Sequence, residues 1–592
     1  MQQRLFDFVE TQVSERPAGV MLASKVNGAW QTLSCKEVWA QAQDMAAGIL
    51  QLNINNTELN PERQEKIALV SQNRPEWIIT DLAIQQTGGI ITPIYPTVST
   101  TDFAFILNEA EVRIIFFASQ ELYERFQPAF KDVPTLQHIY TFDEVPNVKN
   151  WKLLKGDVTG EEKRKEVCER ITTDTIATII YTSGTTGKPK GVMLSHKNIV
   201  SNVIDSAPCF HFARKDDRAL SFLPLNHIFE KMVTYVYINA GLGIYYAESM
   251  DTIGDNLKEV KPMVFTCVPR LLEKVYEKIM NKGLELTGIK RSLFFWAVEL
   301  GKKFDNVKKG SIFYQMQLWL ANKIIFNKWR EALGGRVEAV VSGSAALSEK
   351  LIRIFSAAQI TIMEGYGLTE TSPVISVNTL ESEGRRMGTV GPILRNVQVK
   401  LAEDGEIMCK GNNVMVGYYK NPEQTAKEID ADGWFHTGDI GVWVEDKFLK
   451  ITDRKKEIFK TSGGKYVAPQ TIENKMRESP YIEQMMVVGP DRKFVAALIV
   501  PNYGQIRTKL KADGKSVPQD NEAMIKDEAV IALIQQQIDR YNPEFGHVEQ
   551  VKKFTLLPAE WTIDNGVLTP KLSIKRKVIA EQYSKEIDAM YE

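Results

Sequence analysis

The sequence predicts an α/β protein: a large N-terminal domain of doubly wound sheets with a small distorted β-barrel, and a smaller α+β C-terminal lid domain. Through most of the first 385 residues, short β-branched apolar runs alternate with helix-length segments, which indicates crossover units and parallel strands. From about residue 385 to 450, short strands bounded by Gly dominate, which is typical of antiparallel β-structure. Helices and strands mix again after this stretch.

Length and composition set the outer limits of the prediction. A chain of 592 residues is too long for one ordinary core, and its formal net charge of −1 gives no reason to expect a nucleic-acid partner. The five Cys lie far apart without a C-x-x-C pair, which favours a reducing compartment over a disulfide framework or a zinc site. The sequence has neither a signal-peptide pattern at its start nor an apolar run of about 18 residues. We therefore expect a cytoplasmic protein that does not span a membrane.

The expected elements follow one another in an α/β order. The strands of the large domain read "KIALV", "GIITPIY", "VRIIFFA", "TIATIIY", "ALSFLPL", "GIYY", "MVFTCV" and "VEAVVSG", with helical patterns such as "RPEWIITDLAIQQTG" between them. The antiparallel part contains "GTVGPIL", "NVQVKLAEDGEIMCKG" and "GVWVEDKFLKITD". Helices at "PQTIENKMRE" and "EAVIALIQQQIDRYN" belong to the smaller domain. The basic, Gly-containing segment Asp453–Gly464 is the best boundary, which divides the chain into domains 1–453 and 454–592.

The segment 272–331 differs in composition from its surroundings, because it is helical, aromatic and basic. Two interpretations stay open. Its helices could simply pack on the main domain, or they could form a surface that rests on lipid or flanks an apolar channel, since aromatic and basic helices can lie at interfaces. The second interpretation would mean peripheral contact with the inner face of a membrane.

The stretch "YTSGTTGKPKGV" (Tyr181–Val192) directly follows a predicted strand and is rich in Gly, hydroxyls and Lys. Backbone N–H groups of a Gly-rich turn can converge on phosphate oxygens, since Gly has no Cβ and adopts positive φ easily. The residues that would contribute are Thr182, Ser183, Gly184, Thr185, Thr186, Gly187, Lys188 and Lys190. We predict a loop that closes over a polyphosphate; a merely flexible turn is the alternative.

This loop does not match a Walker-type P-loop. That motif has four residues between its glycines and a Ser or Thr after its Lys. Here Gly184 and Gly187 are two residues apart, and Pro189 follows Lys188. The next residues, "GVML", predict a second strand rather than a helix, so the loop should join two strands.

The loop resembles that of the AMP-forming adenylating superfamily, which includes acyl-CoA synthetases, peptide-synthetase adenylation domains and beetle luciferases. Three further segments are similar to the family's motifs and occur in the family's order. "MEGYGLTETSPV" (Met363–Val374) resembles the adenine and metal segment, and "DGWFHTGDIG" (Asp432–Gly441) resembles the ribose segment. Asp453–Glu473 resembles the hinge, and the motifs together cover roughly residues 180 to 575.

The resemblance implies roles for individual residues. Tyr366 would offer its ring to adenine, Asp439 would accept both ribose hydroxyls, and Arg454 would contact the same sugar. Glu370 would be a metal ligand with Thr182 as a second, because a carboxylate beside a triphosphate is repulsive unless a divalent cation lies between them. The other implied cofactor-binding residues are Ser344, Ala345, Glu364, Gly365, Gly367 and Thr369, with Gly463 and Gly464 beside the pantetheine arm of coenzyme A.

The implied reaction has two steps. A carboxylate attacks the α-phosphate of ATP and releases pyrophosphate, and the acyl-adenylate then meets a thiol. A small domain that rotates on a hinge at Lys456 would serve both steps. His227 in "LPLNHIFE" would position the carboxylate, with Phe229 and Glu230 near the acyl entrance. A purely structural His is the alternative for His227.

The adenylation lysine departs from the family's pattern. In "NGVLTPKLSIKRKVI", an ungapped match puts Ser573 where that lysine belongs. Lys571 and Lys575 lie two residues to either side, on the same face of an extended segment. We favour Lys571, with Lys575 next.

The stretch "DGWFHTGDIGVWVEDKFLKITDRKK" resembles the fatty-acyl signature of the long-chain acyl-CoA synthetase branch. The resemblance therefore implies a long-chain fatty acid–CoA ligase that uses ATP, Mg²⁺ and coenzyme A. A fatty acyl-AMP ligase or acyl-carrier-protein synthetase is the nearest alternative. An adenylate-dependent monooxygenase and a non-catalytic nucleotide-binding protein represent other classes. The sequence leaves chain-length preference and oligomeric state open.

Overall fold

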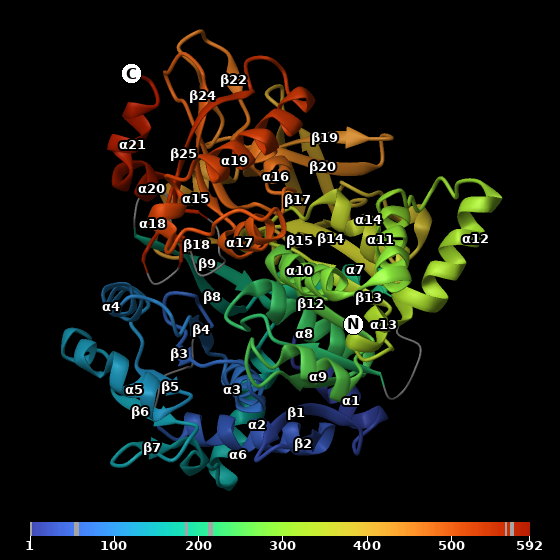
Figure 1. Ribbon diagram of the computed structural model, residues 1–592. Helices are drawn as coiled ribbons and strands as arrows, with labels where there is room; N and C mark the ends of the chain where they lie inside the picture. Colours follow the sequence, from blue (N-terminus) through green and yellow to red (C-terminus); the bar gives the residue numbers. More distant parts are fainter. Residues whose placement is uncertain (1–2, 53–58, 184–187, 211–216, 563–564, 569–573) are drawn as a thin grey trace.

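The computed structural model describes residues 3–52, 59–183, 188–210, 217–562, 565–568 and 574–592. These residues form an α/β fold with two eight-stranded sheets in the N-terminal part and smaller sheets in the C-terminal part, as the sequence predicts (Figure 1). In the described ranges, no helix is both long and apolar enough to cross a bilayer.

One large sheet contains the strands that flank the Gly-rich loop. Its order is β18-β9-β8-β4-β3-β5-β6-β7. The strands are β3 (Lys66–Val70), β4 (Ile90–Ile94), β5 (Ile114–Phe117), β6 (His138–Thr141), β7 (Lys149–Asn150), β8 (Ile176–Ser183), β9 (Pro189–Ser195) and β18 (Gly417–Tyr418). The strands from β8 to β7 are parallel, and every residue of β3, β4 and β5 is buried, as expected when helices cover both faces.

The second large sheet has the order β15-β14-β13-β12-β10-β11-β1-β2. Its strands are β1 (Val20–Val26), β2 (Ala29–Ser34), β10 (Arg218–Ser221), β11 (Gly243–Tyr246), β12 (Val264–Cys267), β13 (Ala339–Ser342), β14 (Thr361–Gly367) and β15 (Val374–Val377). The six central strands are parallel, and the edge strands β2 and β15 are antiparallel to their neighbours. Neighbouring carboxyl ends of β12, β13 and β14 therefore share one edge, where α/β folds bind ligands.

Helices cover and separate these sheets. They are α1 (Asp7–Glu15), α2 (Cys35–Leu50), α3 (Pro75–Gln86), α4 (Thr100–Glu109), α5 (Gln120–Phe126), α6 (Val158–Arg170), α7 (His196–Ser206), α8 (Ile228–Ala240), α9 (Ile253–Val260), α14 (Glu349–Ala357) and α15 (Pro422–Glu428), with short turns η1 (Gln127–Asp132), η2 (Trp151–Leu153), η3 (Ala207–Cys209), η5 (Thr369–Thr371) and η6 (Ser382–Gly384). Every residue of helix α3 except Glu76 is buried, because the helix packs on β4 of one sheet and on β1 of the other. A buried ion pair joins α8 to α3, with Lys231 Nζ 2.7 Å from Asp81 Oδ1.

The segment 272–331 forms helices α10 (Pro269–Glu285), α11 (Gly288–Lys302), α12 (Ile312–Ala321), η4 (Asn322–Phe326) and α13 (Asn327–Ala332). Phe294, Phe326 and Trp329 are buried in the core of the second sheet. The packing interpretation therefore holds for α11, η4 and α13, whereas α12 lies at the edge of the molecule (Figure 1).

The β-rich segment is antiparallel, as predicted, with β16 (Val397–Leu401), β17 (Glu406–Gly411), β19 (Phe435–Val444) and β20 (Phe448–Arg454) in that order. All residues from 397 to 454 are described, and β16 and β20 are the edges of this sheet. On its other side β20 is bridged to the chain before β16: Phe448 pairs with Pro392, and Ile393 pairs with Ser376 of β15. The antiparallel sheet is thus connected through residues 392 and 393 to the edge of the second large sheet.

The chain after residue 454 has its own hydrophobic clusters and an α+β arrangement. The strands are β21 (Phe459–Lys460), β22 (Tyr466–Val467), β23 (Ile482–Val488), β24 (Val495–Pro501) and β25 (Val551–Leu556). The helices are α16 (Pro469–Met476), α17 (Tyr503–Ala512), α18 (Asn521–Met524), α19 (Glu528–Tyr541), η7 (Asn542–Glu544), α20 (Arg576–Gln582) and α21 (Ser584–Ala589).

Candidate active site

The Gly-rich segment joins two antiparallel strands, as the sequence predicts. Thr182 of β8 pairs with Lys190 of β9, and Ser183 pairs with Pro189. Lys188 is exposed, with its Nζ 5.7 Å from the centre of the Phe105 ring. Thr182 and Lys190 therefore stand at the base of the loop. Gly184, Thr185, Thr186 and Gly187 lie outside the described residues.

A carboxylate lies beside the base of this loop. Tyr418 Oη donates a hydrogen bond of 3.0 Å to Glu370 Oε1, and the strand of Tyr418 pairs with β9. Lys190 Nζ lies 5.4 Å from the centre of the Tyr418 ring. Burial raises the pKa of the Tyr418 hydroxyl, which keeps it a neutral donor. Tyr418 was not predicted as a site residue; it holds Glu370 next to the strands that flank the Gly-rich segment.

The donor set around Glu370 fits Mg²⁺. Magnesium binds one or two carboxylates together with substrate phosphates and water, rather than a full protein cage. Glu370 supplies one carboxylate, and the Thr182 hydroxyl belongs to the strand next to β9. Within the described ranges, the chain has no group of three or more His, Cys, Asp and Glu that could hold a metal by itself. A metal here would therefore need phosphate oxygens to complete its shell.

The predicted ribose residues meet the predicted adenine residue. Tyr366 Oη donates a hydrogen bond of 2.7 Å to Asp439 Oδ2, and Arg454 Nε lies 3.6 Å from Asp439 Oδ1. Asp439 and Arg454 are opposite each other on β19 and β20. Burial raises the pKa of the Asp439 carboxyl, and the positive charge of Arg454 opposes this shift. The structure thus brings Tyr366, Asp439 and Arg454 together.

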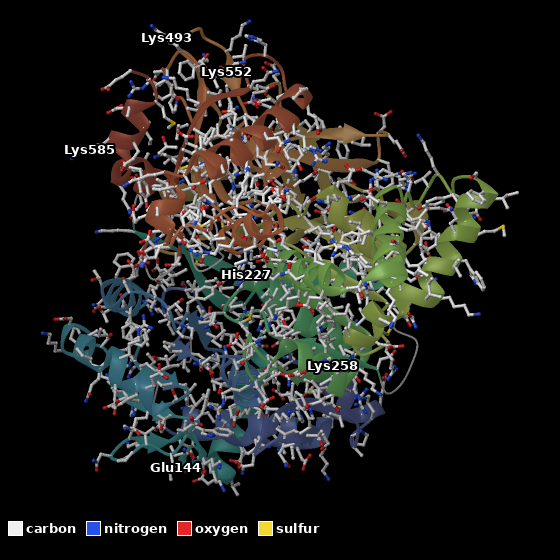
Figure 2. All side chains as sticks on the ribbon, viewed as in Figure 1. Glu144, His227, Lys258, Lys493, Lys552 and Lys585 are labelled. Carbon is white, nitrogen blue, oxygen red and sulfur yellow. The ribbon has the colours of Figure 1, made fainter. Side chains whose placement is uncertain are left out.

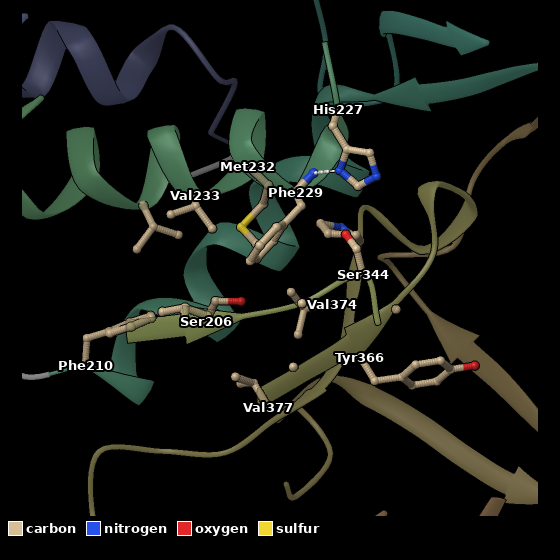
Figure 3. A pocket seen from close by; sticks show the side chains of 16 residues that line it. Ser206, Phe210, His227, Phe229, Met232, Val233, Ser344, Tyr366, Val374 and Val377 are labelled. Carbon is tan, nitrogen blue, oxygen red and sulfur yellow. Dashed lines mark hydrogen bonds between the residues drawn. The ribbon is translucent and has the colours of Figure 1, made fainter. Parts of the chain in front are cut away.

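An apolar cavity lies at the carboxyl ends of β13 and β14, next to α8 (Figure 3). Its lining includes the predicted residues His227, Ser344, Gly365, Tyr366 and Gly367. The sequence did not single out the apolar wall, which is formed by Phe210, Met232, Val233, Val236, Val341, Pro373, Val374 and Val377 together with Ser206 and Gly343. In Figure 3, His227 and Ser344 lie toward one end of the cavity and Phe210 and Val377 toward the other. The lining suits a molecule with a polar head and an apolar tail.

His227 both caps a helix and lines this cavity. Its Nδ1 accepts a hydrogen bond of 3.1 Å from the backbone N–H of Phe229, at the first turn of α8. His227 lies toward the middle of the molecule (Figure 2). His227 thus caps α8 and also lines the cavity, and its role in positioning a carboxylate stays a prediction.

Phe229 lines the cavity, but Glu230 does not, so the prediction that Glu230 lies near the acyl entrance is wrong. The Glu230 carboxylate is fully buried and accepts hydrogen bonds from the hydroxyls of Ser221, at 2.6 Å, and Thr266. Successive helical residues point in different directions, and Glu230 points into the core between α8 and the sheet.

The turn after β13 is held by Glu364. The Glu364 Oε1 atom accepts a hydrogen bond of 3.1 Å from the backbone N–H of Leu347, and burial raises the pKa of this carboxyl to about 8. Ser344 adopts a positive φ of 70° in the turn, and Ala345 is exposed beside it. Gly367 cannot be replaced, because an added Cβ would lie 1.7 Å from the carbonyl oxygen of Pro373. Thr369 is buried in the following turn.

Three of the residues predicted at the hinge are on the surface. Lys456, Gly463 and Gly464 are exposed, and Gly464 has a positive φ of 73°. The neighbouring Lys455 Nζ contacts Asp404 at 2.7 Å and Glu406 at 2.8 Å.

The C-terminal lysine segment is tied to this hinge by an arginine. Lys571 lies outside the described residues, and Lys575 immediately precedes α20. Arg576 contacts Glu457 Oε2 at 2.7 Å through Nε and Glu473 Oε2 at 2.6 Å through Nη2. No local sequence pattern marks Arg576, because both of its partners are more than 100 residues away.

The family model "AMP-binding enzyme" matches residues 9–419, and the model "AMP-binding enzyme C-terminal domain" matches residues 456–592. The chain belongs to the AMP-binding enzyme family. Among curated members, it is 32% identical over 583 residues to Long-chain-fatty-acid--CoA ligase FadD15 of Mycobacterium bovis, which covers 97% of this chain and 95% of that protein. It is 33% identical to Long-chain-fatty-acid--CoA ligase 5 of Mus musculus, over 96% of this chain and 85% of the relative.

Solved structures support the AMP-binding fold. The adenylation domain of a carboxylate reductase from Mycobacterium chelonae superposes with a TM-score of 0.74 at 20% identity, covering 100% of this chain and 91% of that one. The O-succinylbenzoate coenzyme A synthetase of Bacillus subtilis, solved with ATP and magnesium ion, gives 0.65 at 18% identity, covering 94% of this chain and 96% of that one. At these identities the likeness concerns the fold alone.

Proposed function

We propose that this AMP-binding enzyme activates a long-chain fatty acid with ATP and transfers the acyl group to coenzyme A, as a long-chain fatty acid–CoA ligase. The proposal depends on one observation: the apolar cavity and the group around Asp439 share a residue, Tyr366. The cavity that holds His227 and Ser344 also includes Tyr366, which is hydrogen-bonded to Asp439. An apolar acid and a nucleotide bound at this junction would meet at the carboxylate and the α-phosphate. The printed names of the curated relatives support the same activity.

The nucleotide half of the site follows from hydrogen-bonding capacity. The Asp439 carboxylate has two acceptor oxygens for the vicinal hydroxyls of ribose, and Arg454 fixes its orientation at 3.6 Å. Tyr366 holds the same carboxylate, so its ring is fixed beside the sugar position. The backbone around the adenine ring would be shaped by six further residues: Ser344, Ala345, Gly365, Gly367 and the buried Glu364 and Thr369. The Gly-rich loop from Thr182 to Lys190 would close over the β- and γ-phosphates with amides, hydroxyls and two lysines.

Glu370 and Thr182 would hold Mg²⁺, which supplies positive charge to the phosphate oxygens when bound. The chain's own residues supply the rest. Tyr418 orients the Glu370 carboxylate, while Lys190 adds positive charge where the attack of one anion on another is opposed by repulsion. His227 and Ser344 orient the attacking carboxylate, which needs no general base, since it is already ionised at neutral pH.

The second step requires a different set of residues around the adenylate, and a division into two domains between residues 453 and 454 would provide it. The small domain would present Lys571 or Lys575 for adenylation and then rotate about Lys456, so that Gly463 and Gly464 give the pantetheine arm a bare backbone to pass. The cavity must exclude water during this exchange, because an acyl-adenylate is readily hydrolysed. Its apolar wall suits that task.

The proposed compartment is the cytoplasm, with peripheral contact to a membrane surface. All five cysteines are unpaired in the structure, in keeping with a reducing compartment. The substrates proposed here, a fatty acid, ATP and coenzyme A, are small molecules.

The experiment that tests this function is pyrophosphate and AMP release with saturated acids of about 10 to 18 carbons, with and without coenzyme A. The proposal predicts acid-dependent pyrophosphate release and coenzyme A-dependent turnover. Turnover only with an acyl carrier protein would assign the alternative transfer reaction, and an oxygen requirement would assign the monooxygenase. No pyrophosphate release with any acid would overturn the proposal.

A further inference from the structure

Helix α12 exposes an apolar face that the rest of the chain leaves uncovered. Its exposed side chains are Ile312 at 79%, Phe313 at 68%, Met316 at 65%, Trp319 at 63% and Leu320 at 41%. Positions 312, 316, 319 and 320 fall on one stripe of an α-helix. Single exposed apolar residues are ordinary, but a contiguous stripe that includes Phe and Trp marks an interaction surface. We call these five residues the α12 patch.

The patch is held rigidly, because the opposite side of α12 is anchored to the body. Tyr314 Oη donates a hydrogen bond of 3.1 Å to the carbonyl oxygen of Leu300, and Leu318 packs against the core of the second sheet. Just beyond the helix, Asn322 Nδ2 donates to the carbonyl oxygen of Ala357 at 2.9 Å. The helix lies at the outer edge of the molecule (Figure 1).

Positive charge surrounds the patch. Residues 302–331 contain seven Lys and Arg against two Asp and Glu. One of the two acidic residues, Asp305, is already paired with Arg353 at 3.5 Å. Lys308, Lys309, Lys323 and Lys328 are all exposed, and Lys323 Nζ lies 5.2 Å from the centre of the Trp319 ring. An apolar stripe flanked by lysines matches a layer of anionic headgroups above hydrocarbon.

We infer that α12 docks the protein on the surface of an anionic lipid bilayer. The five side chains of the α12 patch enter the headgroup–acyl boundary, and the surrounding lysines pair with headgroup phosphates. A second copy of the chain is a poorer occupant, because a twofold contact would bring the lysines of one patch against those of the other. This inference rests on the peripheral membrane contact proposed above and names the surface that makes it, whereas docking itself needs no bound nucleotide or fatty acid.

The experiment is vesicle co-sedimentation of the full chain, with phosphatidylcholine vesicles containing 30% phosphatidylglycerol compared with pure phosphatidylcholine vesicles. We expect at least 10-fold stronger partitioning onto the anionic vesicles, falling steeply with salt. The double variant Met316→Gln/Trp319→Gln should lose at least 10-fold of this partitioning. The triple variant Lys308→Gln/Lys309→Gln/Lys323→Gln should lose most of the difference between the two vesicle types.

The matched control is Leu153→Gln/Val158→Gln, which removes two apolar side chains that are 69% and 75% exposed near β7 and α6, on the other side of the molecule from α12 (Figure 1). This control should bind vesicles as the parent does. Equal binding of parent and α12 variant would overturn the inference, as would equal binding to the two vesicle types. A lipid-free dimer that the α12 variant dissociates, with no vesicle binding, would assign the patch to self-association instead. Pyrophosphate release that depends on a fatty acid of about 10 carbons tests the proposed function independently of vesicle binding.

Discussion

At the scale of single residues, the hydrogen bond from Tyr366 to Asp439 is the most informative contact of the nucleotide half. It is 2.7 Å long and joins a neutral donor to a buried carboxylate. Hydrogen bonds to charged groups contribute about 1.5–3 kcal/mol. The contact links the cavity to the proposed sugar position, so its loss should affect ATP rather than the fatty acid.

We therefore expect Tyr366→Phe to lower kcat/KM for ATP by roughly 10- to 100-fold, as the loss of a charge-assisted hydrogen bond implies. The ring remains, so KM for the fatty acid should change little. Steady-state kinetics with each substrate varied in turn would measure both. An unchanged kcat/KM for ATP would show that Asp439 does not need Tyr366.

A second residue-scale prediction concerns Glu364, whose folded pKa of about 8 lies above its ordinary value of 4.5. Between these pH values the folded protein binds more protons at Glu364 than the unfolded chain does. The stability that this group contributes is therefore complete below about pH 4.5 and is lost as the pH rises through about 8. Glutamine cannot ionise and can still accept the Leu347 hydrogen bond.

We expect Glu364→Gln to unfold at a temperature close to that of the parent near pH 5 and at a higher temperature near pH 8.5. Differential scanning calorimetry of both proteins across this range measures the effect, and all other titrating groups cancel in the difference. A difference in Tm that does not vary with pH would contradict the raised pKa.

At the scale of elements, the C-terminal lysine segment depends on α16 and on the hinge. Arg576 bridges Glu457 and Glu473, and these carboxylates lie on the hinge segment and on α16. The arginine is five residues from Lys571 and one from Lys575. Its bridge therefore limits where Lys575 can reach.

We expect Lys571→Ala to depress acid-dependent ATP–pyrophosphate exchange by at least 100-fold, while transfer from preformed acyl-adenylate to coenzyme A stays near the parent rate. Lys575→Ala serves as the matched control. If Lys575→Ala alone abolishes exchange, the assignment passes to Lys575.

Arg576→Gln should weaken the same exchange through positioning, by roughly 10-fold, and Arg576→Lys should restore part of it. Both half-reactions should be measured at equal protein stability, since removing Arg576 from its partly buried pairs with Glu457 and Glu473 can itself destabilise the fold. Equal loss in both half-reactions would indicate a structural role only.

At the scale of the whole molecule, the two parts of the chain meet through polar contacts. Arg477 Nη2 lies 3.2 Å from Glu273 Oε1 of α10, and Arg270 of the same helix pairs with Glu483. Asn502 and Gln505 contact Glu277 at 3.4 and 3.1 Å. A polar interface of this kind separates more easily than a hydrophobic one, as a rotating lid requires.

Most of the fold could be predicted from sequence, because it rests on local patterns. The apolar runs from "KIALV" to "VEAVVSG" all became strands, and the Gly-rich loop joins two strands. The contacts that complete the site could not be predicted, since they join distant positions. Tyr418 meets Glu370 across 48 residues, and Arg576 meets Glu473 across 103. The apolar cavity wall likewise comes from four separate elements, so no single pattern in the sequence marks it.

The central claim is that one acyl-adenylate occupies the nucleotide half and the cavity together. A crystal structure with a non-hydrolysable palmitoyl-adenylate analogue tests it most directly. The account predicts the ribose hydroxyls on Asp439, the phosphate side near Glu370, and the acyl chain among Phe210, Met232 and Val377. An analogue bound with its ribose away from Asp439, or with its acyl chain outside this cavity, would contradict the account.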